Sequence, residues 1–219
     1  MNNYEVEPVL RALLGSKHFY DVNCFGTMIK NPIEHVVSLI NATKTTVPQD
    51  DRTKYEFGYY YHQRAKTMQM EYFQPPNVAG WKPYYQEPSY YRLWISSVTL
   101  PQRIDFVDDL VLRNVRKNDY RLSVDPLAYV DAIPTDISRD VNLLLEDLAS
   151  SFFCQPLDPV QLTALKEVLI PGLPDMEWDM EYGNYLDPNT TSDELKQAIQ
   201  NKLKDLFRAM LTLPEFFLS

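Results

Sequence analysis

The sequence contains few of the residues from which several common functional sites are built. It has two cysteines, three histidines and six glycines among 219 residues. The cysteines form no CxxC pair, which excludes the sequence signatures of a zinc ribbon and of a disulfide-rich fold. The glycines form neither GxGxxG nor GxxxxGKS/T, which excludes the signatures of dinucleotide-binding and P-loop proteins. For Cys24 and Cys154 we expect two free buried thiols, with a single bridge between them as the alternative.

Positive charge and long apolar runs are also scarce. Lysine and arginine number 21 against 30 aspartates and glutamates, which gives a formal net charge of −9. An acidic chain of this kind argues against a nucleic-acid partner and against an anionic membrane surface. No apolar run approaches the roughly 18 residues that a membrane-spanning helix requires. The first residues also lack the basic and apolar regions of an export signal.

The chain begins instead on an apolar helical pattern. Its apolar positions are Val6, Val9, Leu10, Leu13 and Leu14, the spacing of one face of a helix. Because the pattern starts within the first two turns, we expect the sequence to be part of a longer protein. Expressed alone, the chain should leave an apolar patch uncovered, and self-association or dye binding would reveal it.

A strong helix start lies at Asn31. Asn31 can cap the helix, Pro32 suits its first turn, and Glu34 can complete a capping box. The residues Ile33, Val36, Val37 and Ile40 follow at i, i+3, i+4 and i+7, and we expect them to form the buried face.

Similar helix starts and apolar stripes recur along the chain. Three further pairs have a cap and an acceptor three residues apart: Thr99 with Gln102, Asp158 with Gln161, and Thr191 with Glu194. Three stripes have helical spacing: Phe57, Tyr61, Ala65, Met68, Tyr72; Val141, Leu144, Leu145, Leu148, Phe152; and Leu195, Ile199, Leu203, Leu206, Met210. The sequence therefore predicts an all-α fold, one compact multi-helix domain over residues 1–219, with long irregular connections and little or no sheet.

Two stretches depart from the helical pattern, residues 72–91 and 174–188. In the second, four acids from Asp175 to Glu181 alternate with Met176, Trp178, Met180 and Tyr182. A period of two predicts an extended segment, so we expect 174–188 to be an extended wrap or loop over the helices. The acids lack the glycine turn of a calcium loop and are expected to face solvent.

The first stretch contains PPNVAGW, residues 75–81. Two prolines stiffen the backbone, and Gly80 permits a positive φ just before the ring of Trp81. Such a loop delivers Trp81 to one place, either into the core or onto a ligand. Because its neighbours are mostly apolar, we expect Trp81 to pack against the helices that start near Asp51 and Tyr90.

No motif predicts a catalytic group, a cofactor or a metal. No two of the three histidines are four residues apart, and HExxH and GxSxG are absent. Glu34 is explained by the capping box. His35 lies roughly 200° around the helix from Ile33, off the expected apolar face, so we expect it to be solvated or to face a partner.

A possible ligand or partner surface can still be named. Around the aromatic loop 72–91, two carboxylates accompany an amide and several rings that could stack on sugars. Together with His35, the candidate residues are Glu71, Asn77, Trp81, Tyr84, Tyr85 and Glu87. The burial of Trp81, Tyr84 and Tyr85 would discriminate a carbohydrate site, which exposes its rings, from a structural plug.

Several motifs together resemble a known family. NNYEVEPVLRALLGSKHFYD, IKNPIEHVVSLI, PPNVAGW with YRLWISSVTLPQR behind it, and the closing LTLPEFFLS are similar to the bacterial domain of unknown function 1800 family. The resemblance covers most of the chain and is weakest between about 120 and 190. Members are typically about twice this length, so the resemblance implies that the chain is the C-terminal half.

The resemblance implies context rather than chemistry. It suggests an exported bacterial protein of the periplasm or cell envelope. Its partners would be the N-terminal half of the same architecture or another exported protein. We therefore expect an uncharacterised helical structural or interaction module, with no catalytic activity evident in this half. The alternative is a carbohydrate-binding or carbohydrate-active domain that uses loop 72–91.

Overall fold

The computed structural model describes residues 5–78, 80, 81 and 90–219. Within these ranges the chain forms ten α-helices, three 3-10 turns, one π-helical turn and one short antiparallel hairpin. The prediction of an all-α fold with little sheet is confirmed. Tyr84, Tyr85 and Glu87, three of the candidate site residues, lie outside the described residues.

The elements follow one another in a simple order. They are α1 (Val6–Leu14), η1 (Val22–Cys24), α2 (Pro32–Ala42), α3 (Asp51–Thr67), η2 (Tyr90–Trp94), α4 (Thr99–Asp108), η3 (Asp109–Arg113, the π-helical turn), β1 (Val115–Lys117), β2 (Tyr120–Leu122), α5 (Pro126–Asp131), α6 (Thr135–Ser138), α7 (Val141–Phe152), α8 (Pro159–Leu169), α9 (Met176–Leu186), α10 (Asp193–Leu211) and η4 (Pro214–Phe217).

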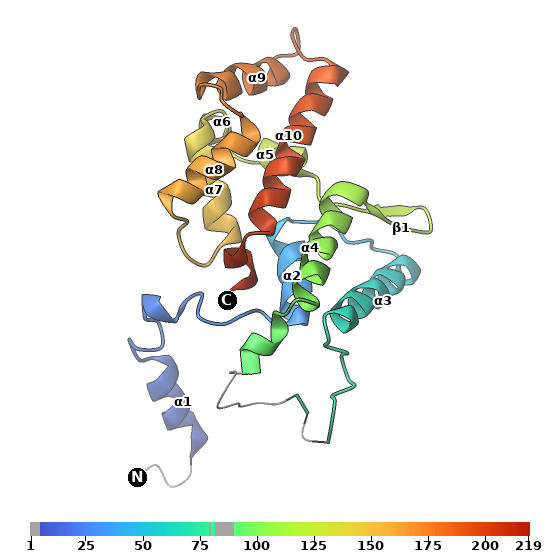
Figure 1. Ribbon diagram of the computed structural model, residues 1–219, viewed down its shortest axis with the longest axis vertical. Coiled ribbons are helices and arrows are strands. Elements are labelled where there is room, and N and C mark those ends of the chain that lie inside the picture. Colours follow the sequence, from blue (N-terminus) through green and yellow to red (C-terminus); the bar gives the residue numbers. More distant parts are fainter. Residues whose placement is uncertain (1–4, 79, 82–89) are drawn as a thin grey trace.

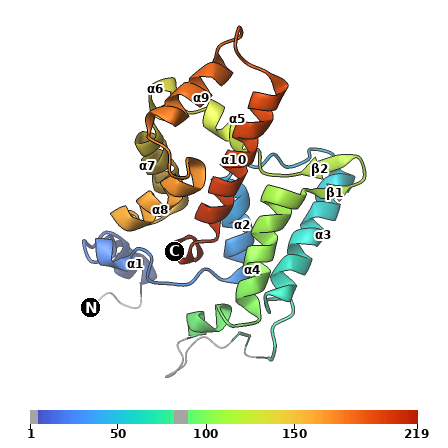
Figure 2. The same cartoon turned by 45° about the horizontal axis from the view of Figure 1, so that its top comes forward.

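Helix α10 is the centre of the molecule. It packs against α8, α5, α9 and α7 on one side and against α4 and η3 on the other (Figure 1). Helices α2, α3 and α4 pack on one another and form the second group, which Figure 2 shows side by side. One continuous cluster of buried apolar side chains runs from α2 to η4 and joins the two groups.

The helices with the clearest sequence signals form as predicted. Asp140 caps α7, and Ser192 caps α10 by accepting from the Leu195 backbone N–H. All five residues of the stripe predicted for α7 are buried, and so are four of the five predicted for α10: Ile199, Leu203, Leu206 and Met210. These stripes meet in the common core, so their burial explains why α10 lies at its centre.

Of the four predicted capping boxes, two are present. Asn31 with Glu34 and Asp158 with Gln161 form complete boxes at the starts of α2 and α8. The other two predictions are wrong. The cap of α10 is Ser192, one residue after Thr191, and the hydroxyl of Thr99 instead hydrogen-bonds within the 94–99 turn that precedes α4.

The predicted extended segment 174–188 is helix α9, so this prediction is wrong. Trp178 and Tyr182 lie four residues apart and are both buried, whereas Met176 and Met180, also four apart, are both exposed. The alternation of acid and apolar residues therefore results from two opposite helical faces rather than from a strand. Three of the four acids pair with bases elsewhere in the chain: Asp175 with Lys166, Asp179 with Arg139 and Glu181 with Lys202.

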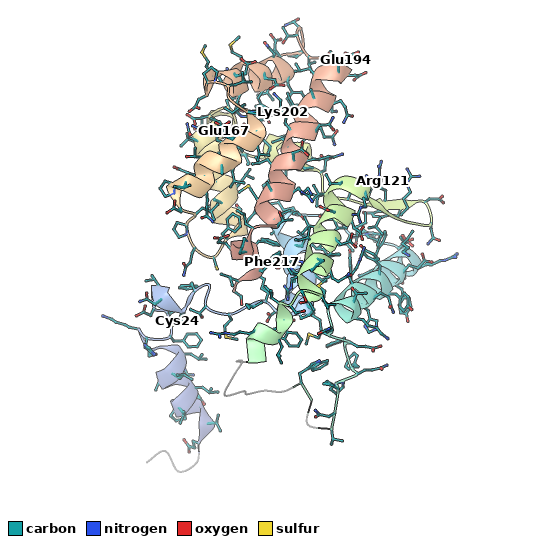
Figure 3. All side chains as sticks on the ribbon, in the orientation of Figure 1. Cys24, Arg121, Glu167, Glu194, Lys202 and Phe217 are labelled. Atoms are coloured by element: carbon teal, nitrogen blue, oxygen red, sulfur yellow. The ribbon has the colours of Figure 1, made fainter. Side chains whose placement is uncertain are left out.

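The two cysteines are free, as expected, but both are exposed rather than buried. Cys24 lies on the segment between α1 and α2 and is labelled in Figure 3. Cys154 follows α7 directly, in an irregular connection at the surface. A connection of this kind leaves side chains in solvent that a helix face would have buried.

Helix α1 has no buried residue. Its apolar face is present as the sequence predicts, but its side chains contact solvent, and in Figure 1 the helix lies apart from the other helices. The apolar face of α1 is thus exposed, and self-association or dye binding through it stays a prediction.

Candidate functional site: the groove between α2 and α3

The face of α2 that is buried is not the one that the sequence predicts to be buried. The buried residues are Pro32, His35, Val36 and Leu39. Of the expected apolar face only Val36 is buried; Ile33 and Ile40 are half-buried, and Val37 remains 48% exposed. The prediction that His35 is solvated or partner-facing is therefore wrong, because its side chain has no exposed area at all.

Aromatic rings explain why a histidine occupies the buried face. The ring of His35 lies 6.1 Å from that of Phe106, 6.0 Å from that of Phe216 and 5.3 Å from that of Phe217, all in edge-on geometry. Burial, aided by the nearby cations of Arg103 and Lys30, lowers the pKa of His35 to about 3. At neutral pH the imidazole is thus an uncharged ring that packs as an aromatic.

The C-terminal turn closes this face of α2. The Phe217 carbonyl accepts from the Lys30 backbone N–H at 2.8 Å, and Phe216 lies beneath the Lys30 ammonium at 4.5 Å from ring centroid to Nζ. Figure 3 labels Phe217 beyond the end of α10, close to α2. The motif LTLPEFFLS therefore covers the face of α2 that carries His35.

A buried arginine completes the closure. Arg103 is fully buried and donates from Nη2 to the carbonyls of Lys30, at 2.7 Å, and Trp94, at 3.1 Å. Its guanidinium also lies 5.7 Å from the centroid of the Phe217 ring. Arg103 thus joins η2, α4 and the segment before α2, although burial lowers its pKa to about 10.

The opposite face of α2 opens into an apolar groove. The groove has a volume of about 320 Å³ and lies between α2 and α3. Its walls come from Ile33, Val36, Val37, Ile40 and Asn41 on α2, from Gly58, Tyr61, His62 and Ala65 on α3, and from Tyr72. A volume of this size is at the lower end of the range for ligand pockets, and apolar walls with few polar groups are typical of binding sites.

Two small residues of α3 keep the groove open. Gly58 and Ala65 lie seven residues apart, on the same face as Tyr61 and His62. A Cβ atom added to Gly58 would meet no atom of the described chain within 4 Å. Glycine in the middle of a helix costs roughly 1 kcal/mol relative to alanine. The residue that keeps this space open therefore lowers the stability of α3.

The connection between α2 and α3 is fixed at both ends. The Thr43 hydroxyl donates to the Leu39 carbonyl at 2.7 Å and lies 2.7 Å from the Thr45 hydroxyl. Asp50 caps α3 through the Thr53 backbone N–H at 2.8 Å. The two walls are therefore positioned by short-range bonds on either side of the connection.

Ion pairs hold the far side of α3 against α4 and η3. Arg64 donates to Asp105 at 2.9 Å and pairs with Asp109, while the Tyr60 hydroxyl donates to Asp109 at 2.7 Å. Arg113 bonds both carboxylates, and its hydrogen bond is the main cause that lowers the pKa of Asp105. Networks of this kind hold geometry more than they add stability, and here they fix the α3 wall.

The polar groups of the groove are few. The Tyr61 hydroxyl is buried without a hydrogen-bond partner among the described residues, and burial raises the pKa of Tyr61 to about 12. At the rim, the Glu71 carboxylate lies 2.8 Å from the Lys66 Nζ and 3.9 Å from the His62 Nε2. A charged rim around apolar walls suits an amphipathic ligand.

The other predicted site residues that the structure describes are not among those that line the groove. Glu71 is half-buried, Asn77 is exposed, and the Asn77 carbonyl accepts from the Gly80 N–H at 2.9 Å. Gly80 has a φ of +88°, the conformation that the motif predicts. Trp81 is half-buried, and its packing against the helices from Asp51 and Tyr90 remains a prediction.

The groove was hidden in the sequence because both of its walls look like core. Ile33, Val37 and Ile40 on α2 and Tyr61 and Tyr72 after them were predicted to be buried stripes. The signal that could have revealed the groove is Gly58, a glycine inside an otherwise regular helical stripe.

Exposed rings lie on α3 and just after it. They are Tyr55, Tyr59, Tyr72 and Phe73, each more than half exposed. The ring of Tyr59 stacks on that of His62 at 6.3 Å with an interplanar angle of 28°. Exposed aromatic clusters of this kind mark interaction surfaces on soluble proteins.

Other features of the described residues do not compete with the groove. A polar cleft of about 570 Å³ between α6, α7 and α9 contains four aspartates, but Arg139 pairs with Asp179 and Lys166 with Asp175. No group of three or more metal-binding side chains converges in the part of the chain that the structure describes. Nor does any described helix combine the length and the apolar character that crossing a membrane would need.

Comparisons with known proteins give one match. A family model described as "Protein of unknown function (DUF1800)" matches residues 1–218, which is nearly the whole chain. No curated protein and no solved structure matches the sequence.

Proposed function

Because the chain belongs to DUF1800, a family described as proteins of unknown function, we propose a function from its geometry: it is a helical interaction module. The groove between α2 and α3 receives the apolar face of a partner helix. One observation carries the proposal. Both walls present side chains at i, i+3, i+4 and i+7, Ile33 to Ile40 on α2 and Gly58 to Ala65 on α3, toward an open space.

This arrangement supports recognition of a helix more than recognition of an extended chain. An extended peptide binds by adding its backbone to an exposed strand edge, whereas an amphipathic helix inserts apolar side chains into a groove. The described part of the chain has only the β1–β2 hairpin as sheet, and none of its residues lines the groove. Small residues in the α3 wall, Gly58 and Ala65, leave room for the anchoring side chains.

The family resemblance suggests where such a helix comes from. The N-terminal half of the same architecture and another exported protein of the cell envelope are the sources that the resemblance implies. These sources remain predictions. A structural role follows in either case, because burying an apolar groove stabilises both partners in one arrangement.

The test uses short helical peptides held in shape by an internal cross-link, because isolated helices of this length are marginal. One peptide carries leucine at i, i+3, i+4 and i+7, and the other has the same composition in scrambled order. Fluorescence anisotropy measures the binding of each to the full chain. We expect the patterned peptide to bind at least about 10-fold more tightly, which corresponds to about 1.4 kcal/mol.

A pair of variants shows whether binding occurs in the groove. Gly58→Leu fills the open space with a side chain that favours the helix, and Gly58→Ala leaves most of that space free. We expect Gly58→Leu to weaken peptide binding at least about 10-fold and Gly58→Ala to preserve it. Equal binding of both peptides, or equal binding by both variants, contradicts the proposal.

The exposed rings of α3 support a second candidate, carbohydrate binding. Tyr59 and His62 stack side by side, and the Glu71 carboxylate lies 3.9 Å from the His62 Nε2. Flat rings beside a carboxylate suit a sugar face and its hydroxyl groups. Pull-down on insoluble chitin, cellulose and peptidoglycan would test this candidate. Retention that is lost in Tyr59→Ala but kept in Gly58→Leu would favour it, and absence of retention on all three would exclude these glycans.

A further inference from the structure

We propose that the helix received by the α2/α3 groove is α1 of a second copy of this chain, so that two chains exchange their α1 helices reciprocally. The inference rests on the proposed function of the groove and names its occupant. It joins two apolar features that the described core leaves uncovered, a helix with no buried residue and a groove that no side chain of the described residues fills.

Helix α1 presents a complete set of anchoring side chains. Val6, Val9, Leu10, Leu13 and Leu14 are between 45% and 66% exposed. They occupy positions i, i+3, i+4, i+7 and i+8, so they project from one face. A helix whose apolar face is this exposed needs a partner, because patches of this kind are rare on stable monomers.

The helix and the groove match in length and spacing. The nine residues of α1 span about 13 Å, and the stretch Ile33–Ile40 that lines the groove is about 11 Å long. The groove side chains on each wall follow the same i, i+3, i+4, i+7 spacing as those of α1. Such sets interdigitate when helices pack, since ridges of one helix enter the gaps of the next.

Charge does not oppose this docking. The charged side chains within α1 are Glu7 and Arg11, and they pair with each other at 2.8 Å. They lie on the side of the helix away from the centre of the apolar face. Docking of α1 therefore brings no unpaired charge into the apolar groove, where such a charge would be costly.

The position of α1 favours a second copy over the helix's own groove. Between α1 and α2, the Phe25 carbonyl accepts from Gln155 Nε2, and Met28 and Lys30 pair with Ser219 and Phe217. These contacts anchor the segment beside the end of α7 and the C-terminal turn. In Figure 1, α1 accordingly extends from the opposite side of the molecule to α3.

The area needed for a specific interface favours a reciprocal exchange. A fully exposed valine or leucine side chain buries about 100 Å², so the five of α1 at half exposure contribute roughly 250 Å². With a similar contribution from the groove, one docked helix buries about 500 Å², well under the roughly 1,000 Å² of a specific interface. Two reciprocal contacts reach that size.

Sedimentation equilibrium of the full chain over a wide concentration range tests the exchange. We expect a monomer–dimer equilibrium. Leu10→Glu places a charge in the centre of the docked face, and Gly58→Leu fills the groove. Each should raise the dissociation constant of the dimer about 100-fold or more, because the symmetric dimer contains each change twice.

Matched controls separate this result from a loss of folding. Ala12→Glu adds the same charge to α1 more than about 100° from the centre of its apolar face, and Gly58→Ala changes the same position in α3. Both controls should dimerise as the parent does. Leu10 is exposed and Gly58 faces open space, so circular dichroism should be unchanged in all four variants.

Mixing the two disruptive variants gives the sharpest result. The Gly58→Leu chain retains α1, and the Leu10→Glu chain retains the groove, so the mixture can form one of the two contacts. Energy transfer between labelled chains should appear in the mixture at high concentration and be absent from either variant alone. Transfer that is equally absent from the mixture contradicts the exchange.

The outcomes distinguish this inference from the proposed function. A parent chain that stays monomeric, or a dimer insensitive to both Leu10→Glu and Gly58→Leu, overturns the exchange. If the patterned peptide still binds in the groove, the partner helix belongs to another protein or segment and the proposed function stands. If the peptide fails to bind as well, both fail.

Discussion

The two faces of helix α2 differ in burial, and the difference is the opposite of what their polarity predicts. The face with His35 is closed by three phenylalanine rings, by Arg103 and by the C-terminal turn. The face with Ile33, Val37 and Ile40 is more apolar, yet it lines an open groove. The more polar face is the buried one.

This difference teaches that apolar spacing identifies a face that needs covering but does not say what covers it. The His35 face is covered by segments of the same chain, from as far along as Phe217. For the other face the described chain supplies only the second wall, from α3 and Tyr72. An uncovered apolar face on an ordered helix is the mark of an interaction surface.

Truncating one side chain on each face should give the largest contrast. Leu39 has no exposed area, so Leu39→Ala creates a cavity and should cost about 3 kcal/mol of unfolding free energy. Val37 is 48% exposed, so Val37→Ala should change stability by less than about 0.5 kcal/mol. Urea denaturation of the two variants and the parent measures both. Similar losses for the two would mean that the groove face is packed.

The pH dependence of stability should report the closed face. The pKa of His35 is about 3 in the folded chain against 6.5 when unfolded. Its contribution is therefore complete above about pH 6.5 and is lost as the pH falls toward 3, since the unfolded chain binds the proton first. His35→Leu removes this loss, so between pH 7 and pH 4 the variant should gain about 3 kcal/mol relative to the parent.

Parallel curves of unfolding free energy against pH for the parent and His35→Leu would show that His35 is accessible to water. Measuring the difference between the two proteins at each pH removes the contributions of the carboxylates that both share.

A smaller effect is expected at the start of α2, which both faces share. Asn31 accepts from the backbone N–H groups of Ile33 and Glu34, each at 3.0 Å. Asn31→Ala leaves these donors without their acceptor and should cost about 1 kcal/mol. Denaturant midpoints decide this, and an unchanged midpoint with an unchanged slope would show that the capping box contributes nothing.

Much of the fold could be predicted from the sequence because its signals are local. The cap at Asn31 and the stripes of α7 and α10 depend on neighbours within a few turns. The errors arise where distant residues decide. Trp178 and Tyr182 made α9 a helix by packing inward, and Phe216 and Phe217 made the His35 face the core. Neither of these packing contacts can be predicted from a short window of the sequence.

The candidate site was harder to predict than the fold. Glu71, at the rim, was named, and its neighbour His62 was not. The walls were recognised as apolar stripes and assigned to the core, because the sequence does not show which stripes find a partner within the chain. Gly58 is the one residue that interrupts these helical stripes locally. That it marks a groove becomes clear only from the open space beside it in the structure.

Methyl NMR of the full chain with a soluble paramagnetic cosolute tests most directly whether the second face of α2 is an open docking surface. We expect fast relaxation of the Val37 methyl groups and slow relaxation of the Leu39 methyl groups, which have no exposed area. Adding the patterned helical peptide should slow the relaxation of Val37 to near that of Leu39 and leave Leu39 unchanged. Equal relaxation of the two residues without peptide, or no protection of Val37 with it, would contradict the account.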